Sequence, residues 1–438
     1  MAEREENLAP PRRQPVDWQS EQYYNKELLD NELERVFDIC HGCRRCVSLC
    51  NAFPTLFDLV DESETMEIDG VDKKDFHKVV DECYLCDLCA ETKCPYLPPH
   101  SWAVDFPHLM LRAKAQQHKN KETRARDRII ASTDQVLPVF ATPGIANLAN
   151  AASKAKSLRK LGNAMFGIHD QAPLPQFTSK TARKRFQNWS TKSSDHKVAI
   201  YVTCYGETVT PEIVGALANI LRHNDVEVDL LHDAACCGVP KLELGDLPGV
   251  QKQMEKNLEL FASTVQNGFK IMSVVPSCTW MYRRELPLLF PENEQVKLIS
   301  EAMVAPFEYF ASLHKNNLLK TDFPASLGRV TYHASCHQRT QNVGLKTRDI
   351  LSLIPETEVT QLERCSGHDG TYALRSESYA AAQKISRPVV KRVRDSKPDT
   401  WGSDCPMASN LIESELTEPD LRKEHPIEML ARAYGLDT

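Results

Sequence analysis

Several features that would place a chain in a common class are missing from these 438 residues. No run of 18 apolar residues occurs, so no transmembrane helix is predicted. The first residues, MAEREENLAPPRRQP, are charged and proline-rich and lack the apolar core of a signal peptide. The net charge of −7 gives no reason to expect nucleic-acid binding. We therefore expect a cytoplasmic protein, either free or at the inner face of the membrane.

Motifs for nucleotide binding and hydrolysis are missing as well. The sequence has no Walker-type lysine loop, no GxGxxG after a strand, and no Ser-His-Asp constellation supported by spacing. A flavin is therefore not expected on this chain. What the chain does have is fifteen cysteines. In a long chain without a signal peptide, this number favours reduced thiolates that hold metal over a disulfide framework.

Eight of the cysteines form two closely spaced runs near the N-terminus. The first run is C-x2-C-x2-C-x3-C and the second is C-x2-C-x2-C-x4-C-P, and their members are Cys40, Cys43, Cys46 and Cys50, then Cys83, Cys86, Cys89 and Cys94. In two-cluster ferredoxins the remote cysteine of each run ligates the other cluster. The spacing thus predicts two [4Fe-4S] clusters, one on Cys40, Cys43, Cys46 and Cys94, the other on Cys83, Cys86, Cys89 and Cys50.

Structural zinc is the alternative for these runs, but it favours two separated C-x2-4-C pairs over three evenly stepped cysteines. The sequence departs from the bacterial ferredoxin run at Asn51, where proline is usual, and in the x4 step before Cys94. Neither departure changes the number of ligands. Apolar residues at helical spacing before each run, such as Leu33, Val36 and Phe37, favour a mostly helical ferredoxin domain.

Composition and periodicity divide the chain into five parts, and the predicted fold class is α+β multidomain. Residues 1–20 are expected to be a disordered arm, 21–120 the helical ferredoxin domain, and 121–196 a basic, amphipathic connector. From residue 197, short β-rich runs alternate with helices, which predicts a parallel sheet with ligands at the carboxyl ends of its strands. This α/β pattern occurs twice, over 197–328 and 329–438.

The connector has two interpretations. Ile145, Leu148, Ala149, Ala152 and Leu158 can share one face of a helix with lysines opposite. Such a face suits a membrane surface or a partner subunit. An amphipathic stripe more commonly faces the protein's own core, which is the second interpretation.

The cysteines of the two α/β repeats follow the predicted strands. Repeat one contains Cys204, Cys236, Cys237 and Cys278, and repeat two contains Cys336, Cys365 and Cys405. Equivalent cysteines are 132, 129 and 127 residues apart, and such near-constant offsets indicate an internal duplication. We expect two similar halves about a pseudo-twofold axis.

The phrases CCGVPKLELGD, PSCTWMYRRELPLLF, YHASCHQ and HPIEMLARAYG resemble the CCG cysteine-rich domain family of iron–sulfur oxidoreductases. This family includes the B and D polypeptides of heterodisulfide reductases. The likeness is greatest to the iron–sulfur (C) polypeptides of anaerobic glycerol-3-phosphate dehydrogenases, in which a two-cluster ferredoxin domain precedes two CCG repeats. Glycolate oxidase and lactate-utilisation iron–sulfur subunits are similar in organisation.

The resemblance implies a motif of one cysteine, a CC pair and a C-x-x-C, which holds a noncubane [4Fe-4S] cluster. Repeat one lacks the last cysteine, replaced by Met281, but keeps four thiolates, so it is expected to bind an additional noncubane cluster. Repeat two has Ser366 and Ala408 at two of these positions. Its three thiolates imply a [3Fe-4S] or water-ligated cluster, bound weakly or not at all.

Four histidines lie near the cysteines in the sequence and are candidate ligands. His333 or His337 in repeat two could add a nitrogen to a cluster, although packing or hydrogen-bonding roles are favoured for both. His41 and His232 are expected to be neighbours of clusters rather than ligands.

The resemblance also implies an electron-transfer subunit, a component of an oxidoreductase rather than a stand-alone enzyme. It would accept electrons from a partner flavoprotein dehydrogenase of the glycerol-3-phosphate or 2-hydroxy acid type and pass them to a quinone or another redox carrier. Two alternatives are a disulfide or heterodisulfide-type reductase acting at the CCG cluster, and a redox partner of a peroxide-reducing di-iron protein.

Overall fold

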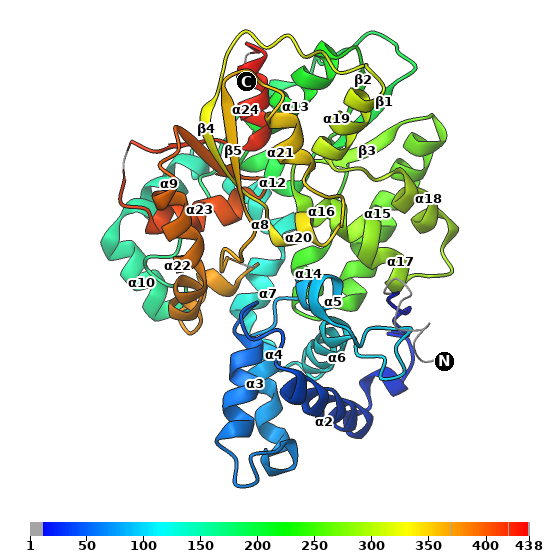
Figure 1. Ribbon diagram of the computed structural model, residues 1–438, viewed down its shortest axis with the longest axis vertical. Helices are drawn as coiled ribbons and strands as arrows, with labels where there is room; N and C mark the ends of the chain where they lie inside the picture. The colour runs from blue at the N-terminus through cyan, green and yellow to red at the C-terminus, as the bar shows by residue number, and fades with distance from the viewer. Residues whose placement is uncertain (1–11, 369, 419, 437–438) are drawn as a thin grey trace.

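The computed structural model describes residues 12–368, 370–418 and 420–436 (Figure 1). A helical N-terminal region lies at the bottom of the view, and two α/β repeats lie above it. The fold class is confirmed at this level. Residues 1–11, over which the disordered arm is predicted, lie outside the described residues.

Five α-helices form the N-terminal region: α2 (Lys26–Cys43), α3 (Ala52–Asp61), α4 (Phe76–Asp81), α5 (Leu88–Lys93) and α6 (Phe106–Lys119). Helix α2 begins where the Asn25 side chain accepts a hydrogen bond from the Leu28 N–H, and it carries Cys40 and Cys43 in its last turn. Aromatic rings hold these helices together, with Phe37 edge-on to Phe76 at 5.1 Å. The first cysteine run thus begins on a rigid helix end.

Residues 12–20 are ordered, contrary to the predicted arm. The Val16 N–H donates to the Leu288 carbonyl at 2.8 Å, and the Trp18 indole N–H donates to the Leu289 carbonyl at 3.0 Å. Both side chains are buried. Proline and charge content predicts disorder only where the chain finds no partner, and this segment finds one in repeat one.

Arg13 anchors this segment in a buried ionic network. Its guanidinium donates two hydrogen bonds of 2.9 Å to Asp105 and one each to Asp87 at 2.6 Å and Glu285 at 3.1 Å. The Arg13 side chain is only 6% exposed. The ring of His108 lies between Asp105 and Glu285, 3.1 Å from each. The network therefore joins the N-terminal segment, the helical region and repeat one.

This network predicts a pH-dependent stability. Burial and Arg13 act to lower the pKa of His108, but Asp105 and Glu285 outweigh them and raise it to about 9. An unfolded histidine has a pKa of about 6.5. Protonated His108 therefore stabilises the folded protein fully below about pH 6.5, and this stabilisation is lost as the pH rises to about 9. The stability difference between wild type and His108→Gln should shrink over this window in thermal unfolding, whereas exposed His314→Gln should show no such trend. Parallel profiles for wild type and His108→Gln would contradict this role.

Each repeat contains a small parallel sheet. In repeat one, β1 (Lys197–Tyr201) lies between β2 (Glu227–Leu231) and β3 (Lys270–Ser273). In repeat two, β4 (Gly328–His333) lies between β5 (Thr357–Leu362) and β6 (Thr400–Ser403), and β7 (Arg422–Lys423) extends the edge. A parallel bridge from Ile271 to Met303 occupies the position equivalent to β7. The shared strand order supports the inferred duplication.

Helices surround both sheets. Those of repeat one are α12 (Cys204–Thr208), α13 (Pro211–His223), α14 (Val239–Glu243), α15 (Leu247–Gln266), α16 (Pro276–Trp280), α17 (Leu286–Leu289), α18 (Glu294–Ala302) and α19 (Pro306–Lys315), with a π-helical turn, η4 (Met281–Glu285). Those of repeat two are α20 (Cys336–Arg339), α21 (Lys346–Leu351), α22 (Tyr379–Asp395), α23 (Pro406–Glu415) and α24 (Pro426–Ala433).

The two repeats exchange their last helices. Helix α24 of repeat two packs on α13 of repeat one, and α19 of repeat one packs on α21 of repeat two. Both exchanged helices start with the same device, in which Glu308 and Glu428 accept a hydrogen bond from the N–H at the helix N-cap. This reciprocal packing is consistent with the predicted pseudo-twofold axis between the two halves.

The connector forms α7 (Ala125–Ala131), α8 (Thr133–Phe140), α9 (Ile145–Lys154), α10 (Lys156–Phe166) and α11 (Ala182–Arg185). The predicted single helix is therefore two, separated at Ala155. The larger side chains of its apolar face are open to solvent, since Leu148 is 71% exposed and Ile145 and Leu158 are also exposed. Ala149 and Ala152 of the same face are half-buried, so the face packs only in part on the protein's own body.

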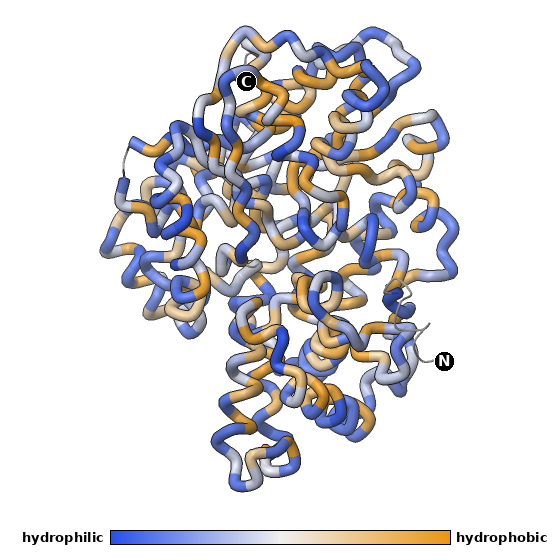
Figure 2. Tube along the Cα trace, viewed as in Figure 1, coloured by the Kyte–Doolittle hydropathy of each residue, from blue (hydrophilic) through white to orange (hydrophobic). Residues whose placement is uncertain are grey.

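Hydrophobic residues gather along the inner elements of both repeats, while the outer loops are mainly hydrophilic (Figure 2). Among the described residues, no helix is both long and apolar enough to cross a membrane.

Candidate metal centres

The eight N-terminal cysteines form two neighbourhoods of four. We call Cys40, Cys43, Cys46 and Cys94 the first cysteine set. Burial raises the pKa of Cys40, and the nearby thiols raise it further, Cys94 most strongly and then Cys46 and Cys43. We call Cys50, Cys83, Cys86 and Cys89 the second cysteine set. Burial, and then Cys83 and Cys86, raise the pKa of both Cys50 and Cys89. The remote cysteine of each run thus lies beside the other run. Cys46 also raises the pKa of Cys89, so the two sets are adjacent.

The backbone winds tightly at both sets. Arg44 in the first run, and Leu85 and Asp87 on either side of Cys86, have positive φ values of 50°, 55° and 60°. Non-glycine residues rarely adopt this conformation, and alternating right- and left-handed residues turn successive amide N–H groups toward an anion. The backbone therefore turns sharply beside the cysteines of both sets.

The electrostatics of the sets fit metal binding. Burial raises the pKa of Cys46 to about 12, with further increases from Cys94 and Cys43. Four thiolates so close together repel one another unless a cation neutralises them, and metal binding supplies that charge while releasing protons. In the described parts of the chain, no group of three or more His, Cys, Asp or Glu side chains is arranged to hold a single metal ion. The thiolates of a four-iron cluster bind separate irons, so they stand farther apart than the ligands of one ion.

The second cysteine set touches repeat two. The Cys86 thiol is hydrogen-bonded to Cys336, which lowers the pKa of Cys86, and burial opposes this effect. Cys336 in turn is hydrogen-bonded to Cys365, and Cys365 is close enough to raise the pKa of Cys50. A continuous row of sulfurs therefore leads from the helical region into the repeats. Sequence alone gave no indication of which repeat would make this contact.

In repeat one the four cysteines meet at the carboxyl ends of β1, β2 and β3. The Sγ atoms of Cys237 and Cys278 are 3.1 Å apart, and those of Cys204 and Cys236 are 4.0 Å apart. Hydrogen bonds from Cys204 and Cys237 lower the pKa of Cys236. The Thr133 hydroxyl of the connector lies 3.4 Å from the Cys236 sulfur.

The glycine of each CCG or CSG triplet has a geometric role. Gly238 and Gly367 have φ values of 90° and 76°, and their N–H groups donate to the sulfurs of Cys236 at 3.5 Å and Cys365 at 3.3 Å. A Cβ on Gly367 would lie 2.2 Å from the Ala382 carbonyl oxygen. Only glycine fits this turn. Hydrogen bonds from backbone N–H groups to the sulfurs of an iron–sulfur cluster are one means of setting its reduction potential.

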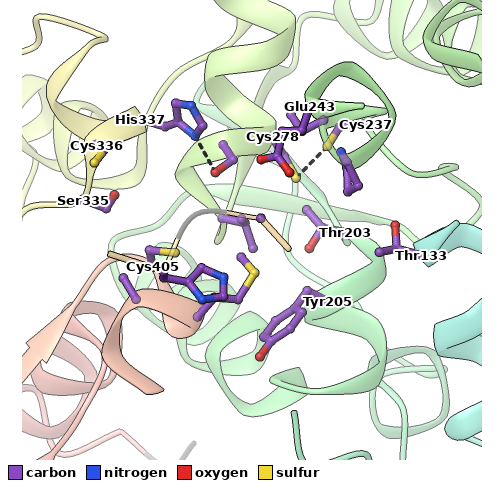
Figure 3. Close-up of a pocket in the computed structure, with 18 of the residues that line it drawn as sticks. Thr133, Thr203, Tyr205, Cys237, Glu243, Cys278, Ser335, Cys336, His337 and Cys405 are labelled. Atoms are coloured by element: carbon purple, nitrogen blue, oxygen red, sulfur yellow. Dashed lines mark hydrogen bonds between the residues drawn. The ribbon is translucent and has the colours of Figure 1, made fainter. Parts of the chain in front are cut away.

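One cavity of about 130 Å³ lies between the repeats, and cysteines from both line it (Figure 3). Cys237 and Cys278 lie on one side of the view, and Cys336 and Cys405 lie on the other. All seven repeat cysteines contribute to the lining: Cys204, Cys236, Cys237, Cys278, Cys336, Cys365 and Cys405. We call this space the inter-repeat cavity. Thr133 and Leu137 of α8 add a wall that sequence analysis missed.

The histidines weighed from sequence differ in their surroundings. Both ring nitrogens of His333 are hydrogen-bonded, to the Ser403 hydroxyl at 2.9 Å and the Arg364 carbonyl at 2.7 Å. His337 Nδ1 bonds the Ser277 hydroxyl at 2.8 Å, and its ring stacks on Trp280 at 4.2 Å. His41 lies beside Arg44, and His232 lies 3.7 Å from Glu207. His368, which also lines the cavity, was not singled out from sequence.

Residues 198–283 and 330–408 match the cysteine-rich domain family CCG. Both α/β repeats therefore match the CCG family. The chain is similar to the C polypeptide of the anaerobic glycerol-3-phosphate dehydrogenase of Escherichia coli (strain K12), with 28% identity over 337 residues that span 76% of this chain and 83% of that protein.

Two further relatives match shorter stretches. Lactate utilization protein A of Bacillus pumilus is 26% identical over 220 residues, which cover 49% of this chain and 90% of that protein. The B polypeptide of the fumarate reductase (CoM/CoB) of Methanothermobacter marburgensis is 25% identical over 248 residues, covering 55% of this chain and 47% of that protein.

Proposed function

We propose that this chain is the iron–sulfur electron-transfer subunit of a dehydrogenase complex. It accepts electrons from a flavoprotein acting on glycerol 3-phosphate or a 2-hydroxy acid and passes them to a quinone or another carrier. Similarity to one polypeptide of a glycerol-3-phosphate dehydrogenase and to a lactate utilization protein supports this assignment. Iron–sulfur clusters bound to the cysteines would supply one-electron storage.

The observation that carries the proposal is the row of sulfurs. The first cysteine set adjoins the second through Cys46 and Cys89, and the second adjoins repeat two through Cys86 and Cys336. Repeat two faces repeat one across the inter-repeat cavity. Clusters bound to these cysteines would lie next to one another, which is the requirement for a relay. Electrons would then enter the CCG domains through repeat two.

The proposed ligands are those predicted from the spacing. Cys40, Cys43, Cys46 and Cys94 hold one [4Fe-4S] cluster of a ferredoxin-type domain, and Cys50, Cys83, Cys86 and Cys89 hold the other. In repeat one, Cys204, Cys236, Cys237 and Cys278 hold a further, noncubane cluster. The amides of the tight turns, including that of Gly238, stabilise the thiolate charge.

The test compares the lone chain with the complex. Anaerobically reconstituted protein should be reduced by dithionite yet remain inert toward glycerol 3-phosphate, glycolate and lactate. Adding the cognate flavoprotein should give substrate-dependent reduction of a quinone analogue for one of these substrates. Turnover by the lone chain would contradict the relay assignment.

Disulfide reduction is the second candidate, because the inter-repeat cavity brings cysteines of both repeats to one enclosed space. Reduction of a disulfide there needs two electrons, which the relay would deliver singly. Dithionite-reduced protein that cleaves a small disulfide catalytically, without any flavoprotein, would favour this candidate over the first.

The exposed face of α9 and α10 supports docking on an anionic lipid surface. Besides Leu148 and Leu158, the side chains of Leu161, Met165 and Phe166 are exposed there, and Lys154, Lys156 and Lys160 are exposed beside them. The two helices lie at the periphery of the molecule (Figure 1). Apolar side chains flanked by lysines are typical of helices that lie in a membrane interface.

Vesicle binding measures this contact. Replacing Leu148 and Leu161 by Asp should weaken co-sedimentation with anionic phospholipid vesicles by at least about tenfold, since each leucine contributes roughly 1.5–3 kcal/mol on burial. Leu318→Asp, at an exposed leucine elsewhere, is the matched control. Unchanged vesicle binding together with lost binding of the flavoprotein would assign the face to that partner instead.

A further inference from the structure

Repeat two lacks a fourth sulfur, and its two replaced positions do not supply a ligand. Ala408 has no donor atom. The Ser366 hydroxyl accepts a hydrogen bond of 3.4 Å from the His368 N–H, so it is directed toward the backbone. The remaining sulfurs of Cys336, Cys365 and Cys405 line the inter-repeat cavity. A cluster held there needs one more donor or remains open to water.

His368 lines the same cavity, and both of its ring nitrogens are buried without a hydrogen-bond partner. A buried polar group without a partner costs roughly 1–3 kcal/mol, so it calls for an explanation such as a missing ion. Burial lowers the pKa of His368 to about 4. The ring is therefore neutral near pH 7, which is the form that binds metal.

Other buried histidines of repeat two are engaged to different extents. His333 uses both nitrogens, as described above, and His425 accepts from the Ile427 N–H and lies 3.0 Å from the Asp404 carbonyl. His337, which lines the same cavity, is held by Ser277 through Nδ1 and by stacking on Trp280, and its Nε2 is buried without a partner. Among these rings, His368 alone has neither nitrogen hydrogen-bonded in the described part of the chain, and His337 is the rival ligand that the experiment must separate from it.

The local sequence also suits a ligand. Cys365 and His368 form a C-x2-H step, the same spacing that separates successive cysteines in the two N-terminal runs. Gly367 turns the chain between them at positive φ, in a space where no side chain fits. The two donors thus emerge from one fixed turn, as metal-binding C-x2-C pairs do.

We propose that His368 is the fourth protein ligand of an iron–sulfur cluster in repeat two, together with Cys336, Cys365 and Cys405. This inference rests on the proposed iron–sulfur function and replaces the expectation that repeat two binds a cluster weakly or not at all. A neutral imidazole in place of a thiolate leaves the cluster less negative, which raises its reduction potential. The cluster at which electrons enter the CCG domains would then be the most readily reduced cluster of the relay.

The experiment uses the full chain, reconstituted anaerobically, with natural-abundance or 15N-labelled histidine. Pulsed EPR of the reduced protein should show a histidine nitrogen coupled to one cluster, and the coupling should change with the isotope. His368→Ala should abolish the coupling. His368→Cys should also abolish it while retaining the iron and shifting one midpoint potential downward. His337→Ala, in the same cavity, should retain the coupling.

Three results would overturn the inference: no nitrogen coupling in wild type, coupling that persists in His368→Ala, or coupling lost in His337→Ala instead. Iron content separates this failure from failure of the proposed function. If about eight irons bind to the N-terminal cysteines but Cys336→Ala and His368→Ala lose none, only the repeat-two cluster is wrong. A chain that binds no iron or sulfide at all overturns the proposed function itself.

Discussion

Replacing Arg13 by Met should destabilise the junction between the helical region and repeat one by about 3–5 kcal/mol, because it removes one of the two buried cations of the network and leaves the hydrogen bonds of Arg13 to the buried carboxyl groups unmade. Asp87 and Glu285 are 3% and 2% exposed, and each accepts a hydrogen bond from Arg13. Hydrogen exchange of residues 12–20 and of η4 measures the loss locally. This local measure is needed because a multidomain chain has no single unfolding transition.

Two further variants sharpen this test. Arg12→Met removes an exposed arginine from the adjacent position and should have little effect. Arg13→Lys keeps the charge but cannot reproduce the paired bonds to Asp105, so its effect should be intermediate. Equal exchange in Arg12→Met and Arg13→Met would show that the network does not hold the junction.

Mutating Cys50 to Ala should remove about four irons from the chain and leave the first cysteine set loaded, because Cys50 lies with Cys83 and Cys86. Double mutants give the sharpest form of this prediction. Cys50→Ala with Cys86→Ala should lose no more iron than either single change, since both remove the same cluster. Cys50→Ala with Cys40→Ala should lose about eight irons.

The uncrossed arrangement makes the opposite prediction. If Cys50 completed a cluster with Cys40, Cys43 and Cys46, the pair Cys50 and Cys40 would be non-additive and the pair Cys50 and Cys86 additive. Lys93→Ala, adjacent to Cys94 but with no sulfur, controls for disturbance of the loop. Counting iron and sulfide in each variant distinguishes the two arrangements.

Sequence was sufficient where a physical rule ties spacing to geometry. The evenly stepped cysteines, the alternation of strands and helices, and the constant offsets predicted the helical region and the two α/β repeats, all of which the structure contains. The strand ends brought the repeat cysteines to one cavity because parallel strands point the same way.

Such rules do not predict contacts between segments that are distant in the sequence. Arg13 finds its partners 74, 92 and 272 residues away, so a local measure of charge and proline content predicted disorder instead. His368 was missed because a histidine directly after a CSG triplet gives no signal until its nitrogens are seen to lack partners. The break between α9 and α10 likewise depends on a turn that the apolar stripe does not reveal.

The exchange of α19 and α24 between the repeats has a consequence for how this chain can change over time. Neither repeat is a self-contained unit, because each completes its partner's helical layer. A repeat that lost its metal chemistry could not be deleted without uncovering α13 or α21 of the other. Selection on the shared fold would thus keep repeat two in place while its ligand positions, such as Ser366 and Ala408, were free to drift. In this architecture, chemical specialisation of the two halves can proceed without any change in their scaffold.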